Sequence, residues 1–274
     1  MNGFEKIVYF LSARMEKPEI FGTWHLVSLT LAVLLAAFMV WKFKDCNDKT
    51  LRRVLLVFWV IIVIFEVYKQ TVFSMDSDGV TAKWDYQWYS FPFQFCSTPM
   101  YLLPILIFAK EGKFRNAVVA YMATFSLFAG LAVMIYPGDV FIDMIGINIQ
   151  TMVHHGLQFV IGVFLVAHNR HHLNKRFFAW CMIVFSVLAL VALAMNLIMH
   201  NVFLANGMDD TFNMFFISPY HACTLPILSA IYPLVPYPVF LLIYVLGFAL
   251  VSALVYTIEK VTVSICSKIK HRND

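Results

Sequence analysis

Side chains that can carry nucleophilic chemistry lie inside stretches of the sequence that are otherwise apolar. Cys96 lies in one such stretch and His155 in another. A thiol attacks an ester when a base such as imidazole takes its proton, and nearby amide or hydroxyl groups can bind the oxyanion that forms. A lone cysteine in a helix is more often an inert packing residue. The polar residues that accompany this pair are Gln94, Ser97, Thr98, Gln150, Thr151, His154 and Gln158.

Two adjacent histidines, His154 and His155, cannot face the same site on a helix, because successive residues are about 100° apart. His155 shares a face with Thr151 and Gln158, whereas His154 shares a face with Gln150. The spacing therefore favours His155 as the histidine that faces a site. We expect His154 to bond a neighbouring helix.

The elements that must position these residues are membrane-spanning helices. With 61% hydrophobic and 13% charged residues and a mean hydropathy of +0.76, the chain lies far outside the range of soluble domains. A span needs about 20 apolar residues to cross roughly 30 Å of hydrocarbon. The sequence predicts an all-α protein with seven spans and a single membrane domain over residues 1–274. The predicted spans are Phe21–Lys42, Arg53–Phe73, Phe91–Phe108, Ala117–Tyr136, Asn148–Ala167, Phe177–Met199 and Val239–Glu259.

Positive charge alternates between the connectors, and this pattern predicts the orientation of the chain. Connectors one, three and five carry basic residues, among them Lys44, Lys113 and Arg170. Lysine and arginine near spans stay cytoplasmic, so the N-terminus is predicted outside and the C-terminus inside, in a multi-pass protein of the cell membrane. The same orientation explains the net charge of +4, and we expect no nucleic-acid partner. Acidic residues of the outer connectors are Asp76, Asp78, Asp85, Asp139, Asp143, Asp209 and Asp210.

Two segments outside the spans have their own patterns. Met1–Lys17 has apolar residues at helical spacing between charges, which is typical of a short interfacial helix. Asn201–Pro238 has apolar runs broken by prolines, and such runs are too short to span. This pattern predicts a re-entrant or surface-lying cap. The five cysteines have no paired spacing, so we expect no disulfide framework.

The predicted span directions bring the polar residues into the outer half of the bilayer. Glu66 and Lys69 lie one turn apart on the second span and can pair on one face. His25 opens the first span, and Asn196 lies near the outer end of the sixth. Polar groups at this depth are costly unless they have partners. The pattern predicts a buried cavity that opens toward the outer side, and we interpret Glu66 with Lys69 as a structural ion pair.

Four motifs give the chain a family resemblance. They are Gly-Thr-Trp-His-Leu at Gly22–Leu26, Phe-Pro-Phe-Gln-Phe-Cys at Phe91–Cys96, Val-His-His-Gly at Val153–Gly156 and Val-Pro-Tyr-Pro-Val-Phe at Val235–Phe240. With them the chain resembles the YwaF-like integral membrane family of bacteria and its vertebrate transmembrane acyltransferase relative. In that family a histidine or similar polar residue usually stands two before the cysteine and the last motif is richer in tryptophan, whereas Gln94 and Tyr237 stand there in this chain.

The vertebrate relative looks like a cysteine-dependent acyltransferase on phospholipid acyl chains, and the more distant androgen-induced hydrolases use a threonine and a histidine on ester lipids. The resemblance implies a lipid acyltransferase or acyl-ester hydrolase with a Cys96–His155 dyad and a membrane phospholipid or other acyl-ester lipid as substrate. We expect no cofactor. Candidate substrate-binding residues are His25, Gln94, Thr98, Thr151, Gln158 and Asn196.

Other functions are compatible with the same polar residues. A transporter or a small-solute-binding membrane protein would use the outer cavity for a solute. A metal hydrolase would draw on the histidines near the outer half, but their spacing matches no recognised zinc signature, and we expect no metal site. The last span has no lysine at mid-depth for a retinal Schiff base, since Lys260 falls at its inner end. The histidines in question are His25, His154, His155, His200 and His221.

Overall fold

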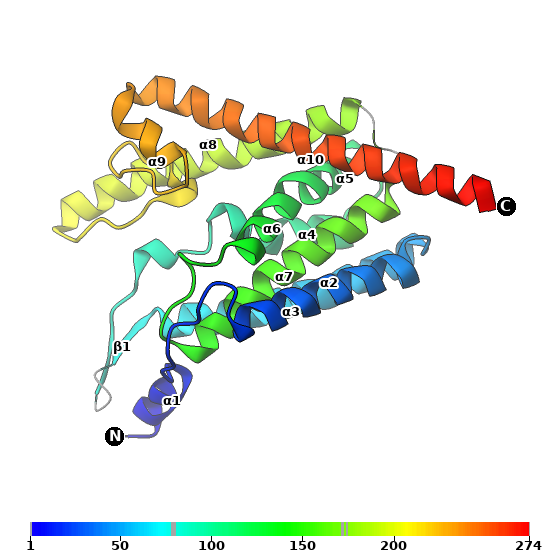
Figure 1. The fold of residues 1–274 in the computed structure, drawn as a ribbon. Helices are drawn as coiled ribbons and strands as arrows, with labels where there is room; N and C mark the ends of the chain where they lie inside the picture. The colour runs from blue at the N-terminus through cyan, green and yellow to red at the C-terminus, as the bar shows by residue number, and fades with distance from the viewer. Residues whose placement is uncertain (1, 78–80, 171–172, 174, 274) are drawn as a thin grey trace.

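The computed structural model describes residues 2–77, 81–170, 173 and 175–273, which excludes Asp78, and it is built almost entirely of helices (Figure 1). Within these residues, five helices are long and apolar enough to cross a membrane. They are α2 (Thr23–Phe43), the continuous helix Lys113–Ile135, α7 (Ile145–His168), α8 (Lys175–Asn206) and α10 (Tyr237–Asn273). Figure 1 shows α8 and α10 side by side along one flank of the molecule.

Shorter elements complete the fold. The predicted N-terminal helix is present as α1 (Gly3–Leu11), where Asn2 and Glu5 form a capping box. A small antiparallel hairpin follows α3 and pairs Met75 with Trp84. The remaining elements are α3 (Asp48–Val72), β1 (Met75–Ser77), β2 (Ala82–Trp84), η1 (Trp88–Ser90), η2 (Phe95–Ser97), α4 (Thr98–Phe108), η5 (Met214–Phe216), α9 (Leu228–Ile231) and η6 (Tyr232–Leu234).

Five of the predicted spans, the first and the fourth to seventh, coincide with the long apolar helices, although α10 continues well beyond the predicted end at Glu259. The second predicted span corresponds to α3, which is 25 residues long. The third was predicted as a helix over Phe91–Phe108, but only Thr98–Phe108 is α-helical. Two prolines explain the difference. Pro92 disfavours helix in the residue before it, Phe91. Pro99 lies in the first turn of α4, where proline is favoured.

The helix Lys113–Ile135 is interrupted at its centre by a wider turn. α5 (Lys113–Tyr121) runs into a π-helix, η3 (Met122–Ser126), and continues as α6 (Leu127–Ile135). All five residues of the π-helix are buried. Phe125 projects from this turn and stacks on Phe185 of α8, with ring centroids 4.5 Å apart. The wide turn therefore fixes the centre of the bundle, and π-turns of this kind are frequent near functional sites.

α7 lies between α2 and α6 (Figure 1), and glycines let it approach α6 closely. A Cβ atom at Gly130 of α6 would lie 2.7 Å from the backbone nitrogen of Phe159 and 2.8 Å from the backbone oxygen of His155. Small residues allow such close approach between membrane helices. Gly130 therefore sets the position of the α7 segment that carries the two adjacent histidines.

Charged side chains close the helix ends where α3, α4 and α5 meet. Arg115 is buried, and its Nη2 lies 2.6 Å from the Asp48 carboxylate. Its Nε donates to the carbonyl of Leu106, and Arg52 donates to the carbonyl of Ile107. These bonds satisfy the last carbonyls of α4, which would otherwise be unpaired. The short helix after the Cys96 turn is therefore anchored at its far end.

The predicted cap segment Asn201–Pro238 begins while α8 is still helical, since α8 ends at Asn206. Phe212 and Phe215 are buried among the helices. Ile227 and Leu234, in contrast, are 79% and 78% exposed. The segment thus has a part that enters the bundle and a part that lies on the surface.

Candidate functional site

Cys96 lies in the short 3₁₀ turn η2 that leads into α4, and the residue is half-buried. The neighbouring Phe95 anchors this turn in the bundle. Its ring lies 5.2–6.3 Å, centroid to centroid, from five other aromatic rings. These rings belong to Tyr121, Phe125, Phe185, Phe215 and Phe248. Aromatic packing on one side therefore fixes the backbone that presents the thiol.

His154 contacts the Cys96 turn directly, with its Nε2 atom 3.0 Å from the Cys96 carbonyl oxygen. A carbonyl only accepts, so Nε2 carries the proton and Nδ1 of the neutral ring is basic. That Nδ1 atom is buried and has no hydrogen-bond partner among the described residues. We predicted that His154 bonds a neighbouring helix; its partner is the turn that carries the candidate nucleophile.

His155 is oriented by its own helix. Its Nδ1 atom lies 2.8 Å from the carbonyl oxygen of Thr151 and donates to it, which leaves Nε2 as the basic nitrogen. The rings of His154 and His155 are 5.3 Å apart, centroid to centroid. Both histidines therefore belong to one cluster beside the Cys96 turn, and each has one basic nitrogen.

A buried ion pair on α3 belongs to the same region. The Lys69 ammonium lies 2.8 Å from Oε1 of Glu66, which confirms the predicted pair. Gln70 also donates to Oε1, at 2.7 Å, while Oε2 is buried without a partner among the described residues. Gln70, which bonds this pair, also bonds the carbonyl of Ser90 in the segment before the Cys96 turn. The ion pair is therefore connected to the segment that leads into that turn.

Sequence reasoning missed the residues that orient this pair. Gln70 donates to the carbonyl of Ser90 at 2.9 Å and accepts from the hydroxyl of Tyr86 at 2.7 Å. One signal was available, because Gln70 lies four residues after Glu66 and therefore on the same helix face. Tyr86 follows the hairpin, where no sequence pattern indicated a contact with α3.

Two candidate substrate-binding residues use both of their amide atoms on the segment after α8. Gln94 donates to the carbonyl of Asn213 at 2.9 Å and accepts from the backbone N–H of Phe215 at 3.0 Å. Asn196 donates to the carbonyl of Met214 at 3.0 Å and accepts from its N–H at 2.7 Å. In this structure both side chains bond backbone N–H and C=O groups of an irregular segment, and these groups would otherwise have no hydrogen-bond partner.

Two further candidates also have structural partners. His25 is fully buried, accepts from the N–H of Phe21 at 2.9 Å and donates to the carbonyl of Met134 at 2.8 Å. The Thr98 hydroxyl donates to the carbonyl of Phe95 at 2.9 Å and lies 3.0 Å from the Tyr121 hydroxyl. His25 therefore joins α2 to α6, and Thr98 fixes the start of α4.

Gln158 differs from these residues. Its side chain is fully buried, and neither amide atom has a hydrogen-bond partner among the described residues. It lies one turn after His155 on α7, on the side that packs against Gly130. A buried amide without partners costs free energy unless a water molecule or a ligand satisfies it. Among the candidate substrate-binding residues, Gln158 is therefore the one with free polar atoms; Thr151 contributes its carbonyl to His155.

Another group of polar side chains lies near the C-terminal end of α8. The carboxylate of Asp210 lies 2.8 Å from Nδ1 of His200 and 3.0 Å from Nε2 of His221, and the Tyr220 ring stacks on His200. Burial acts to raise the pKa of Asp210, but hydrogen bonds from His200, the Phe212 N–H and His221 outweigh it and lower the pKa. In the described part of the chain, no group of three or more His, Cys, Asp or Glu side chains is arranged to hold a metal ion.

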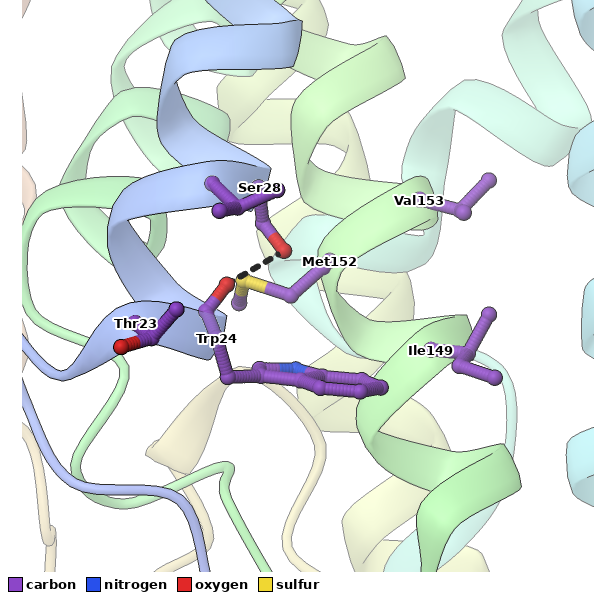
Figure 2. Close-up of a pocket in the computed structure, with 7 residues that line it drawn as sticks. Thr23, Trp24, Ser28, Ile149, Met152 and Val153 are labelled. Atoms are coloured by element: carbon purple, nitrogen blue, oxygen red, sulfur yellow. Dashed lines mark hydrogen bonds between the residues drawn. The ribbon is translucent and has the colours of Figure 1, made fainter.

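A surface groove of about 500 Å³ lies between α2 and α7. Figure 2 shows the Trp24 ring reaching from α2 toward Ile149 of α7, with Ser28 bonded to the Trp24 carbonyl above it. The groove contains neither Cys96 nor a histidine, and its lining is mainly apolar. The lining residues are Thr23, Trp24, Val27, Ser28, Ile149, Met152 and Val153.

The comparison with known families gives one match. The sequence model of the TMEM164 family matches residues 20–256, which include the Cys96 turn and both histidines of α7. No curated protein and no solved structure matches the chain. The match supports a membrane protein of this family, whereas the YwaF-like name and the acyltransferase relation stay predictions from the motifs.

Proposed function

The chain belongs to the TMEM164 family, and from this premise we propose that it is a membrane-embedded lipid acyltransferase or acyl-ester hydrolase in which Cys96 is the nucleophile and His155 the general base. One observation carries the proposal: the turn that presents Cys96 meets the adjacent histidines of α7 through the 3.0 Å contact between His154 and the Cys96 carbonyl. A thiol and two imidazoles with basic nitrogens are the groups that acyl transfer needs.

The proposed topology adds α3 and the segment Phe91–Phe108, which ends in α4, to the five long apolar helices, giving seven spans with the N-terminus outside. At 25 residues α3 is about 38 Å long at 1.5 Å per residue, enough to cross the hydrocarbon. The alternation of basic connectors supports the orientation. In this arrangement Cys96 lies in the outer half of the cell membrane, within reach of membrane phospholipids.

The reaction begins with proton transfer from the Cys96 thiol to Nε2 of His155. The sulfur then forms a bond to the acyl carbon, and collapse of the tetrahedral intermediate breaks the ester C–O bond. The departing alkoxide takes the proton from the imidazolium, which leaves a thioester on Cys96. A lipid hydroxyl or water next gives its proton to His155 and attacks the thioester, the C–S bond breaks, and the sulfur recovers a proton.

The hydrogen bonds support separate roles for the two histidines. The Thr151 carbonyl fixes the tautomer of His155 and leaves Nε2 at the end of the ring as the base, and such a third orienting group accompanies many nucleophile–base pairs. His154 holds the Cys96 backbone in place. The unpartnered amide of Gln158 is suited to donate to the oxyanion.

The substrate that fits this setting is a phospholipid or another acyl-ester lipid. Its ester has to reach a cluster inside the bundle, and its acyl chain requires apolar surface. The groove between α2 and α7 is apolar, lies next to the histidine-bearing helix, and has a volume of about 500 Å³ (Figure 2). Those properties suit an acyl chain or a neighbouring lipid.

The test uses purified protein, a thiol-reactive lipid-like acyl probe and peptide mapping. We expect labelling of Cys96 and loss of labelling in Cys96→Ala. His155→Ala should lower turnover roughly 10²–10⁴-fold, as expected for loss of a general base. The double variant should be no worse than Cys96→Ala, because the two residues act as one unit.

Cys223→Ala is the control, since it removes a free thiol that lies outside the cluster. It should leave labelling of Cys96 unchanged. Labelling of a different cysteine, or full turnover by Cys96→Ala, would refute the proposal. Tight binding of a polar solute that Cys96→Ala retains, without acyl turnover, would instead support a solute-binding protein.

A further inference from the structure

The segment Phe212–Ile217, which enters the bundle after α8, has a strained backbone. Phe215 and Phe216 both have positive φ angles, 58° and 56°. This left-handed region is unfavourable for bulky residues, and two in succession persist only where the surroundings fix them. Phe215 is fully buried, so packing alone leaves it no room to relax.

Side chains from separate parts of the chain hold this segment by its backbone. Tyr244 donates to the carbonyl of Phe215 at 2.9 Å, and Tyr237 donates to the carbonyl of Ile217 at 2.6 Å. Gln94 and Asn196 each add an accepted and a donated bond, as described above. The segment is therefore a fixed framework, and the residues bonded to it take their positions from it.

Gln94 differs from the other three because it belongs to the turn that presents Cys96. The rings on either side of it, Phe93 and Phe95, lie 5.9 Å and 5.7 Å from the Phe215 ring. The carbonyl of Gln94 also accepts the N–H of Ser97 at 2.8 Å, which closes the turn around Cys96. Phe215 is thus contacted by the rings of Phe93 and Phe95 and by the amide of Gln94, all of which lie in or next to the Cys96 turn.

From this arrangement we infer that Gln94 is a positioning residue for Cys96: it joins the turn to the strained segment and does not contact substrate. Both of its amide atoms are bonded to backbone groups of this segment, and these two bonds fix the orientation of the side chain. His154 of α7 bonds the Cys96 carbonyl. The backbone that carries the thiol is therefore held by bonds from Gln94 and from His154. A role in catalysis rests on the function proposed above.

Asn196 provides a matched control for the test. It makes the same pair of bonds to the same segment, on Met214, but it comes from α8 and not from the Cys96 turn. We compare Gln94→Ala with Asn196→Ala and Gln94→Met with Asn196→Leu. The second pair removes both hydrogen bonds but keeps most of the side-chain volume and adds no charge, so it gives the comparison where an alanine variant does not fold. The readouts are the thermal unfolding midpoint, the rate of Cys96 alkylation by iodoacetamide with peptide mapping, and kcat and KM.

We expect the two alanine variants to lower the unfolding midpoint similarly. Gln94→Ala should change the Cys96 alkylation rate and lower kcat by roughly tenfold or more at constant KM, since small misplacements of a reacting group have large effects on rate. Asn196→Ala should change the Cys96 alkylation rate and kcat by less than about twofold. Gln94→Met should change the Cys96 alkylation rate and kcat in the same direction as Gln94→Ala, and Asn196→Leu should leave both within about twofold of wild type.

Equal effects of the two substitutions on Cys96 would show that Gln94 acts only through stability and would overturn the inference. A raised KM at constant kcat in Gln94→Ala would also overturn it, because that pattern indicates substrate contact. If wild-type protein lacks acyl turnover, the proposed function fails, whereas the alkylation rates still decide whether Gln94 positions Cys96.

Discussion

Replacing Gly130 by alanine tests how tightly α6 and α7 hold the site. The new Cβ atom would lie 2.7 Å from the Phe159 nitrogen and 2.8 Å from the His155 oxygen, both backbone atoms. Ordinary contact begins at 3.4 Å, so α7 has to move away by about 0.6–0.7 Å. Neither atom can rotate aside, and the displaced helix is the one that carries His155.

The expected loss of stability comes from two opposing effects. Overpacking costs about 1–3 kcal/mol, whereas alanine in place of glycine inside a helix gains up to about 1 kcal/mol. Gly247 in α10 isolates the first effect, because a Cβ there meets nothing within 4 Å. Since both substitutions gain the same helix propensity, Gly130→Ala should be less stable than Gly247→Ala by about 1–3 kcal/mol.

Thermal unfolding in detergent measures this difference, at about 2–4 °C for each kcal/mol in a chain of this size. Turnover should fall further than stability, because a misplacement of about 1 Å can cost about 100-fold in rate. The reasoning is refuted if Gly130→Ala unfolds at or above the midpoint of Gly247→Ala. A lower midpoint with unchanged turnover would mean that His155 does not depend on this contact.

Three other substitutions test separate parts of the structure. Glu66→Gln leaves the half-buried Lys69 ammonium without its counter-charge and should cost about 3–5 kcal/mol. The loss should appear as a lower yield of folded protein in size-exclusion chromatography; normal folding without turnover would instead place Glu66 in the site. Gln158→Leu should fold as well as wild type, because the lost amide has no partner in the described residues, yet it should turn over slowly; a large drop in the unfolding midpoint would contradict this. Asp210→Asn should lower the midpoint at neutral pH. The pKa of Asp210 is lowered in the folded protein. The difference in unfolding midpoint between wild type and Asp210→Asn should therefore persist down to about pH 4 and disappear below it, because the carboxylate is then protonated. A difference in midpoint that grows below pH 4 would contradict this assignment.

Hydropathy and length were sufficient to predict most of the helical fold. The first predicted span, Phe21–Lys42, differs from α2 by only one or two residues at each end. Hydropathy failed where proline decides the backbone, as at Phe91–Ser97, and where a helix continues past its apolar part, as in α10. The hairpin was not predicted because two strands of three residues carry too little pattern to stand out.

The candidate site was only partly predictable, for a related reason. Residue types indicated that a thiol and imidazoles lie inside the bundle. The spacing assigned His154 and His155 to different faces, with only His155 toward a site, whereas both rings lie in one cluster beside the Cys96 turn. It did not indicate that His154 would meet the Cys96 carbonyl, because that contact depends on a turn that was predicted as helix. It also gave no sign of the contact between Tyr86 and Gln70.

The bilayer itself explains why polar residues in a span are an ambiguous signal. No water is available at that depth, so irregular backbone has to be bonded by side chains. Asn196 and Gln94 serve this purpose for the strained segment, as His25 does for the end of α6. A polar residue in the sequence therefore marks either an irregular turn or a site, and only its unused atoms distinguish the two. By this criterion the basic nitrogens of the histidine pair and the free amide of Gln158 mark the site. Gln94 belongs to the framework that holds it.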